Sequence, residues 1–278
     1  MPNWVHCTKK PDHSSRPGRT AHMNQDYTGS GDPAKSLELL WRRRPQPTRG
    51  PKPGLSVEGI VEAALRIADA EGVAGMSMRR VADELGVGAM TLYRYVPGKG
   101  ELLDVMLDTV YGELPRRAVD GGWRARLDEV ARENRELYLR HPWMLQVAVS
   151  RPPLGPQVMA KYEYELAAVE GIGLTDLEMD ATVALVNGYV HGAVRTAVEA
   201  RQVIQRSGIS DKEWWLAHVP HLDRIGDARN FPLATRVGTA VGNEFDAPYD
   251  PDHAFEYGLE RLLDGVSALV ENRSGPQE

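Results

Sequence analysis

The sequence predicts an all-α fold in which an N-terminal three-helix helix-turn-helix domain precedes a larger helical domain. From Ser56 onward, apolar residues recur three and four positions apart, which is the period of an amphipathic helix. No run shows the apolar and polar alternation of a half-buried strand. Between Ser77 and Tyr95, a short helical pattern, a turn with glycine and a second short pattern have the form of a helix-turn-helix.

The composition is that of an ordinary globular protein. Of the 278 residues, 42% are hydrophobic and 26% are charged. The single cysteine, Cys7, excludes an intrachain disulfide, which fits a reducing compartment. The first ten residues lack the apolar core of a signal peptide, and no apolar run reaches the length of a membrane span. We therefore expect a cytoplasmic protein that does not contact membranes.

Residues 1–54 read as a disordered N-terminal extension that ends in a basic arm. Residues 1–34 are rich in Ser, Gly, Pro, His and Asp, and Met23 is a second candidate start codon. One short helical turn is expected at 35–41. The arm that follows combines prolines, which favour an extended backbone, with the cations Arg42, Arg43, Arg44, Arg49 and Lys52.

Charge is distributed unevenly along the chain. Residues 1–55 carry a net charge of +6, and residues 56–278 carry −12. A basic arm before an acidic body is common in proteins whose tail touches nucleic acid. The alternative is a solubilising tail, which we favour for the first thirty residues.

The predicted helix-turn-helix domain covers residues 55–110. Ser56 and Ser77 are positioned to cap its first two helices. Gly86 suits the left-handed backbone of the turn, and a third helix is expected at 89–95. A fourth helix should begin near Lys99.

Segment 56–103 resembles the N-terminal domain of the TetR family of transcriptional regulators, most diagnostically in GVGAMTLYRYVPGKGELL. The resemblance implies that Gly88, Ala89 and Met90 face DNA bases, with Arg79 reaching a base from the second helix. It places Thr91, Tyr93, Tyr95 and Lys99 at phosphates. Tyr95 departs from the family, which often has histidine there. Because Gly88 and Ala89 offer no side-chain donors, specificity should rest on Arg79, Arg94, methyl contacts and DNA shape.

Residues 56–110 carry a net charge of −4, which is a poor match for a polyanion. We hypothesise that the basic arm supplies the missing attraction, along the DNA backbone or in the adjacent minor groove.

Residues 111–278 are predicted to form the effector-binding and dimerisation domain. Helices are expected at 123–140, 142–150, 156–171, 175–206, 211–219 and 252–272, with a capping box at Thr175 and Glu178. Residues 222–251 read as a long loop. The segments RHPWMLQVAVSRPPLGP, NGYVHG and FEYGLERLLDGVSALV resemble tetracycline-repressor-like C-terminal domains. That resemblance implies a homodimer and an effector cavity between helices.

The candidate liners of the cavity are mostly aromatic or polar: Trp143, Met144, Tyr162, Asn187, His191, Arg195, Trp214, Trp215 and His218. For each of them, ordinary packing is an equally good reading. The dimer interface is assigned to one apolar face: Phe255, Leu259, Leu262, Leu263, Val266 and Leu269. The alternative is that this face packs within one subunit.

These features predict a repressor that binds double-stranded palindromic operator DNA and is released by a small-molecule effector, hydrophobic or antibiotic-like. No catalytic constellation, metal-binding motif or cofactor motif is recognisable, so we expect no enzyme, no metal and no cofactor. An effector-independent DNA-binding protein and an activator stay open as alternatives.

Overall fold

The computed structural model describes residues 28–41, 55–148, 151–225 and 229–274. Its regular elements within these ranges are all helical, which confirms the predicted fold class for the described part of the chain. The elements are α1 (Pro33–Leu40), α2 (Val57–Glu71), α3 (Met78–Glu84), α4 (Ala89–Leu92), α5 (Lys99–Tyr111), α6 (Trp123–Arg140), the 3-10 helix η1 (Pro142–Gln146), α7 (Pro156–Val169), α8 (Asp176–Ser207), α9 (Asp211–Ile225), α10 (Pro232–Phe245) and α11 (Pro251–Ser274).

The helix caps and the glycine turn predicted for the helix-turn-helix are present in the structure. The Ser56 hydroxyl accepts from the Gly59 amide at 3.1 Å, and the Ser77 hydroxyl accepts from the Arg80 amide at 3.1 Å. Gly86 has φ +65°, which is the left-handed backbone that lets α3 turn into α4. The third helix is shorter than expected, because α4 ends at Leu92 and continues only as turns.

The prediction of a loop over residues 222–251 is wrong. Helix α9 runs on to Ile225 with Pro220 inside it, and α10 occupies Pro232–Phe245. Pro232 stands at the start of α10, where its missing amide costs nothing. The expected helix 142–150 also differs: within the described residues 142–148, the 3-10 helix Pro142–Gln146 is the helical part and Val147 is extended.

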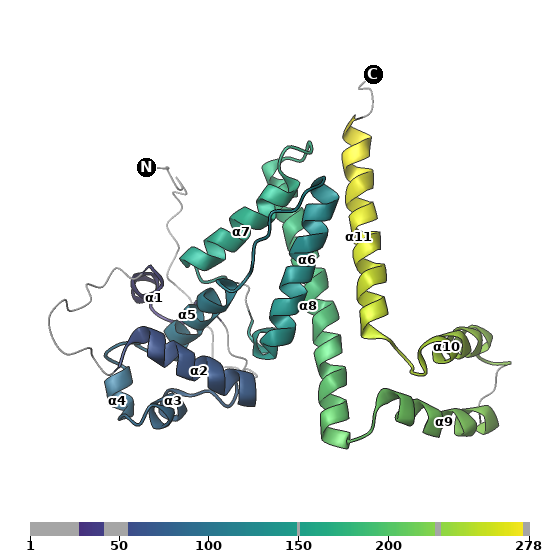
Figure 1. Cartoon of the computed structure of the whole chain (residues 1–278), viewed down its shortest axis with the longest axis horizontal. Coiled ribbons are helices and arrows are strands. Elements are labelled where there is room, and N and C mark those ends of the chain that lie inside the picture. Colours follow the sequence, from purple (N-terminus) through teal and green to yellow (C-terminus); the bar gives the residue numbers. More distant parts are fainter. Residues whose placement is uncertain (1–27, 42–54, 149–150, 226–228, 275–278) are drawn as a thin grey trace, which may run out of the picture.

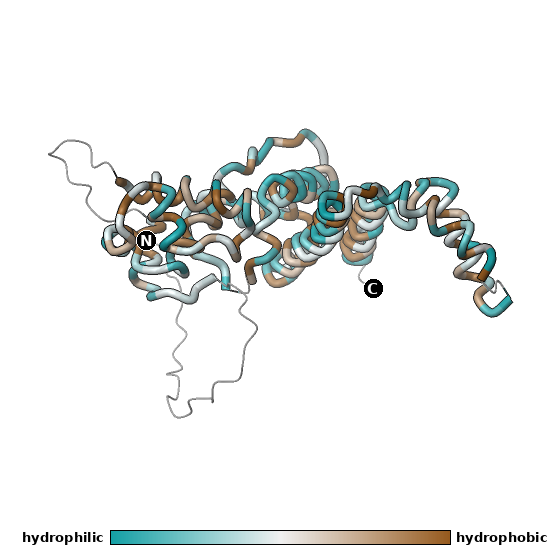
Figure 2. The backbone as a smooth tube through the Cα atoms, turned by 90° about the horizontal axis from the view of Figure 1, so that it is seen from below, coloured by the Kyte–Doolittle hydropathy of each residue, from teal (hydrophilic) through white to brown (hydrophobic). Residues whose placement is uncertain are grey.

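The elements form a body with a projecting pair of helices (Figure 1). Helices α2–α5 lie at one end, and α6, α7, α8 and α11 lie side by side next to them. One hydrophobic core runs from α2 through α5 to α6, α8 and α11. Helices α9 and α10 project away from this body, although apolar residues occur along them too (Figure 2). None of the described helices is both long enough and apolar enough to cross a membrane.

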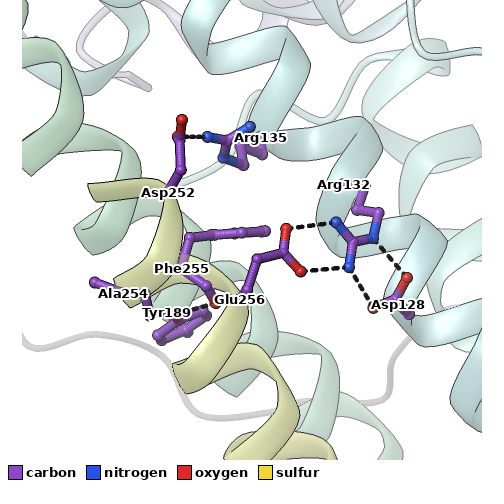
Figure 3. Close-up of polar contacts among 8 residues, drawn as sticks. All are labelled: Asp128, Arg132, Arg135, Tyr189, Asp252, Ala254, Phe255 and Glu256. Atoms are coloured by element: carbon purple, nitrogen blue, oxygen red, sulfur yellow. Dashed lines mark hydrogen bonds and ion pairs between the residues drawn. The ribbon is translucent and has the colours of Figure 1, made fainter. Parts of the chain in front are cut away.

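Helix α11 is fixed to α6 and α8 of the same chain (Figure 3). The Arg132 guanidinium lies between Glu256 and Asp128, with bonds of 2.7 Å to both Glu256 oxygens. Arg135 pairs with Asp252, and its guanidinium carbon lies 4.8 Å from the centre of the Phe255 ring. These contacts place the apolar face of α11 inside the chain.

Candidate nucleic-acid interface and effector site

Helix α4 presents an exposed face that is held in place by buried residues. Leu92 and Val96 are completely buried and fix the angle of α4 against the rest of the helix-turn-helix. Met90 is 78% exposed and Tyr93 is 44% exposed, and Gly88 is exposed beside them. An apolar side chain as exposed as Met90 suits contact with a base edge or a thymine methyl group.

The cations of this region fall into two groups. Arg79 and Arg94 are exposed and have no ion-pair partner among the described residues. Arg80, in contrast, binds Glu71 at 3.0 Å and Glu84 at 3.1 Å, as expected of a residue that does not read DNA. The two unpaired guanidinium groups are therefore available for phosphates or bases.

The other predicted contacts are less exposed. Ala89, Thr91 and Tyr95 are partly buried. Lys99 is also partly buried, and its Nζ donates to the Val73 carbonyl at 3.4 Å. The arm residues Arg42, Arg43, Arg44 and Arg49 lie outside the described residues.

A cluster of buried polar side chains joins α6, α7 and α8. Glu165 accepts from the Asn134 amide at 2.9 Å, from the Asn187 amide at 3.1 Å and from the Lys161 ammonium. The Oδ1 atom of Asn134 is buried without a hydrogen-bond partner in the described part of the chain. A buried acceptor without a partner is costly in a folded protein and is satisfied when a donor enters.

His191 lies one turn beyond Asn187 and meets the Tyr138 ring edge-on, with ring centroids 5.8 Å apart. Its burial, and secondarily the charge of Arg195, lower the pKa of His191. The imidazole is therefore neutral at physiological pH and can both donate and accept.

The remaining effector candidates are scattered. Trp143 and Met144 are buried in the core, where the Trp143 indole nitrogen has no partner among the described residues. Tyr162 lines an open groove of about 400 Å³ between α7 and α8, and Arg195 lines another of about 290 Å³ between η1 and α8. Trp214, Trp215 and His218 lie on α9, away from α6–α8 (Figure 1). One chain thus does not bring the predicted set into one cavity.

Comparison with known proteins decides what this architecture is. A family model described as bacterial regulatory proteins, tetR family, matches residues 60–106. A second model, the tetracyclin repressor-like C-terminal domain, matches residues 114–270. The chain belongs to the TetR family. It is a helix-turn-helix transcriptional regulator, which confirms the predicted family and the prediction that the protein is not an enzyme.

Several TetR-family relatives resemble the chain over most of its length. It is 48% identical over 253 residues to the HTH-type transcriptional repressor DrrR1 of Streptomyces coeruleorubidus, covering 90% of this chain and 91% of that protein. Apo ActR of Streptomyces coelicolor superposes with a TM-score of 0.64 at 28% identity, covering 80% of this chain and 99% of that one. The complex of ActR with actinorhodin also gives 0.64 at 28% identity, covering 77% and 96%.

In this TetR-family chain, four of the six residues predicted for the dimer interface are buried within the single chain. Phe255, Leu259, Leu263 and Val266 are buried within the single chain, and their assignment to a dimer interface stays a prediction. Leu262 is partly exposed and Leu269 is 38% exposed. These two are the most exposed of the six.

Sequence reasoning missed the buried pair Lys161 and Glu165 and their partner Asn134. A signal was present: the two residues are four apart, and Ala168 continues the same face of α7 at helical spacing. Charged residues on a buried face are unusual unless they are paired, which marks the position as special.

Proposed function

We propose that the chain is a homodimeric repressor that occupies a palindromic operator in the cytoplasm and leaves it when a small molecule binds. The observation that carries the proposal is the exposed face of α4 on a helix-turn-helix of the TetR family. The 48% identical DrrR1 is a transcriptional repressor. The proposed division of labour is a DNA-binding domain at 55–110 behind the extension 1–54, and an effector-binding and dimerisation domain at 111–278.

Direct readout in this proposal is sparse. Met90 and Tyr93 meet base edges and backbone, and Arg79 and Arg94 supply positive charge, since neither is paired with an acid in the described part of the chain. Gly88, Ala89, Thr91, Tyr95 and Lys99 lie close to phosphates or bases, and the arm adds Arg42, Arg43, Arg44 and Arg49. A dimer would place two such faces on half-sites about one helical turn, ~34–36 Å, apart.

The effector site of the proposal is the polar cluster between α6, α7 and α8. Neutral His191 beside the Tyr138 ring, and the buried Asn134 oxygen that has no partner among the described residues, offer polar contacts on α6 and α8. Such sites take bulky, mostly apolar ligands with one or two polar groups. ActR, which is similar in fold and sequence, has been solved with actinorhodin. A hydrophobic, antibiotic-like effector is the corresponding choice here.

A second subunit would cover surfaces that one chain leaves exposed. Gly188 and Gly192 on α8 and Gly265 on α11 have open space around them, which permits close helix packing. Leu185 lies exposed on the same helix as the first two glycines. Helices α9 and α10 also expose large apolar side chains, namely Trp214, Leu216, Phe231, Leu233 and Val237.

Release from DNA requires that the effector have a higher affinity for the conformation that cannot bind DNA than for the conformation that binds it. Motion at α7 would pass to α5, and through α5 to the spacing of the two α4 helices.

Fluorescence anisotropy with the protein's own upstream intergenic DNA tests the proposal. Binding that survives scrambled competitor and is released by one member of a panel of aromatic antibiotics supports it. Specific binding that no compound releases favours an effector-independent protein, and a reporter gene that rises with protein level would identify an activator. Binding without sequence preference would overturn the proposal that the protein recognises a specific operator.

A further inference from the structure

A histidine connects the DNA-reading end of the molecule to the rest. His141 follows the last residue of α6 and opens η1, while Asp69 lies near the end of α2 in the helix-turn-helix. Their side chains meet across 72 positions of sequence, His141 Nδ1 lying 2.8 Å from Asp69 Oδ1. Helix α2 packs against η1 at this place.

The other ring nitrogen of His141 also faces a carboxylate. Nε2 lies 3.1 Å from Glu113 Oε2, just beyond the end of α5. A neutral imidazole carries one N–H and can donate only once, whereas the imidazolium donates from both nitrogens. With a carboxylate oxygen at each ring nitrogen, the imidazolium could donate to both carboxylates, whereas the neutral ring could donate to only one.

The limited access of the His141 ring to water makes its hydrogen bonds to the two carboxylates depend on whether both ring nitrogens carry a proton. The His141 side chain is only 9% exposed, whereas those of Asp69 and Glu113 are 36% and 37% exposed. The carboxylates have access to water, and the imidazole has little. The charged groups facing the ring are Asp69 from α2 and Glu113 from the segment after α5, with Arg140 bound to the same Glu113 oxygen at 2.7 Å.

We propose that His141 is a positioning residue that holds α2 of the DNA-binding domain against η1 of the effector domain when its imidazole is protonated. The inference rests on the proposed function, because it makes operator binding depend on the protonation of a residue that touches no DNA. Loss of the proton leaves one carboxylate facing a ring lone pair and removes the charge between the two acids. The contact between α2 and η1 is then weaker, and the DNA-reading head is less firmly oriented.

Glu113 supports this geometry. Its partial burial acts to raise its pKa, but the hydrogen bonds from His141 and Arg140 outweigh that effect, and the pKa of the Glu113 carboxyl lies below its ordinary value. The Glu113 carboxylate is thus ionised across the range in which histidines titrate.

The first arm of the test needs no DNA. Urea unfolding of the full chain is measured for wild type, Asp69→Asn, His141→Gln and the double variant, at about pH 6 and about pH 8.5. We expect the two sites to be coupled by about threefold or more in the folding equilibrium constant at the lower pH, and clearly less at the higher pH. No coupling, or equal coupling at both pH values, overturns the inference.

The second arm measures operator affinity by anisotropy for the same variants and for Glu62→Gln, which removes an exposed acid elsewhere on α2. For each protein, the fold-change in Kd between about pH 6 and about pH 8.5 is measured. This fold-change should be at least about threefold larger for wild type and Glu62→Gln than for Asp69→Asn and His141→Gln. Parallel pH profiles in all four proteins overturn the inference while the regulator stands. If no protein prefers the operator, the proposed function fails, and the unfolding cycle still decides the role of His141.

Discussion

Replacement of Leu40 by alanine tests whether the segment 28–41 is part of the folded junction between the two ends of the molecule. Helix α1 packs on α5, and the Leu40 side chain is 5% exposed. The segment also reaches the effector side: the Thr28 hydroxyl donates to the Ala148 carbonyl at 3.3 Å, and the Trp41 indole donates to the Leu154 carbonyl at 2.9 Å. The segment 28–41 thus touches both halves of the chain.

The expected loss follows from burial and from the position of α1. Leucine-to-alanine replacements in protein interiors cost about 2.7–5.0 kcal/mol, depending on how far the site relaxes. Helix α1 lies at the edge of the core and can close the gap by shifting, so we expect the lower end, about 2–3 kcal/mol. For a chain of this size, each kcal/mol lowers Tm by roughly 2–4 °C, and Leu40→Ala should melt about 4–12 °C below wild type.

Thermal and urea unfolding followed by circular dichroism measure this loss. Leu37→Ala is the matched control, because Leu37 lies on the same helix and is 41% exposed. The control should change the stability by less than about 0.5 kcal/mol. Equal and small effects of the two replacements would refute the docking of α1, since burial would then not distinguish the two leucines.

Three further outcomes follow from particular contacts. Arg94→Ala should weaken operator binding about three- to tenfold and lower the salt slope by about one, whereas Arg80→Ala should leave the slope unchanged in the same anisotropy titrations. Arg132→Gln should cost about 1 kcal/mol in urea unfolding, because its bidentate bond to Glu256 is partly exposed; an unchanged stability would show that this bond does not hold α11. Burial raises the pKa of Asp104 despite opposing hydrogen bonds, so the folded chain binds more protons than the unfolded chain between the two pKa values. The stability of wild type relative to Asp104→Asn should therefore fall as the pH rises from about 4 through the raised pKa. Parallel stability curves of the two proteins against pH would contradict this.

The parts of the fold that local chemistry decides were predictable. The caps at Ser56 and Ser77, the left-handed Gly86 and the capping box at Thr175 each act within four residues of sequence. Their physical causes are backbone donors that need an acceptor and a turn that only glycine adopts without strain. The boundaries of α2, α6 and α8 follow from these signals and from a 3.6-residue period.

The sequence did not disclose features that depend on which segments meet. Helix α10 was missed because the Gly, Pro, Asn and Asp residues in and around it suggested a loop, although its apolar residues recur at helical spacing. The burial of Phe255 and Leu263 within the chain depends on how α11 docks on α6 and α8. The apolar pattern of a helix is the same whether that face packs within its own chain or against a second subunit. The contact of His141 with Asp69 spans 72 positions, which no local pattern encodes.

Helix α5 is built to transmit displacement rather than absorb it. Three of its carboxylates, spaced by three and four residues along one buried face, bind backbone amides of other segments. Glu101 accepts from Asp32 and Asp104 from Gly29, each at 3.0 Å, while Asp108 accepts from the first turn of α7 at 2.9 Å. A shift of α5 by about 1 Å directly away from these donors would stretch the bonds beyond normal geometry, and buried carboxylates left without donors are costly. These bonds link α5 to α7 and to the N-terminal segment, so under the proposed function a ligand that displaced α7 would act on the helix that follows α4.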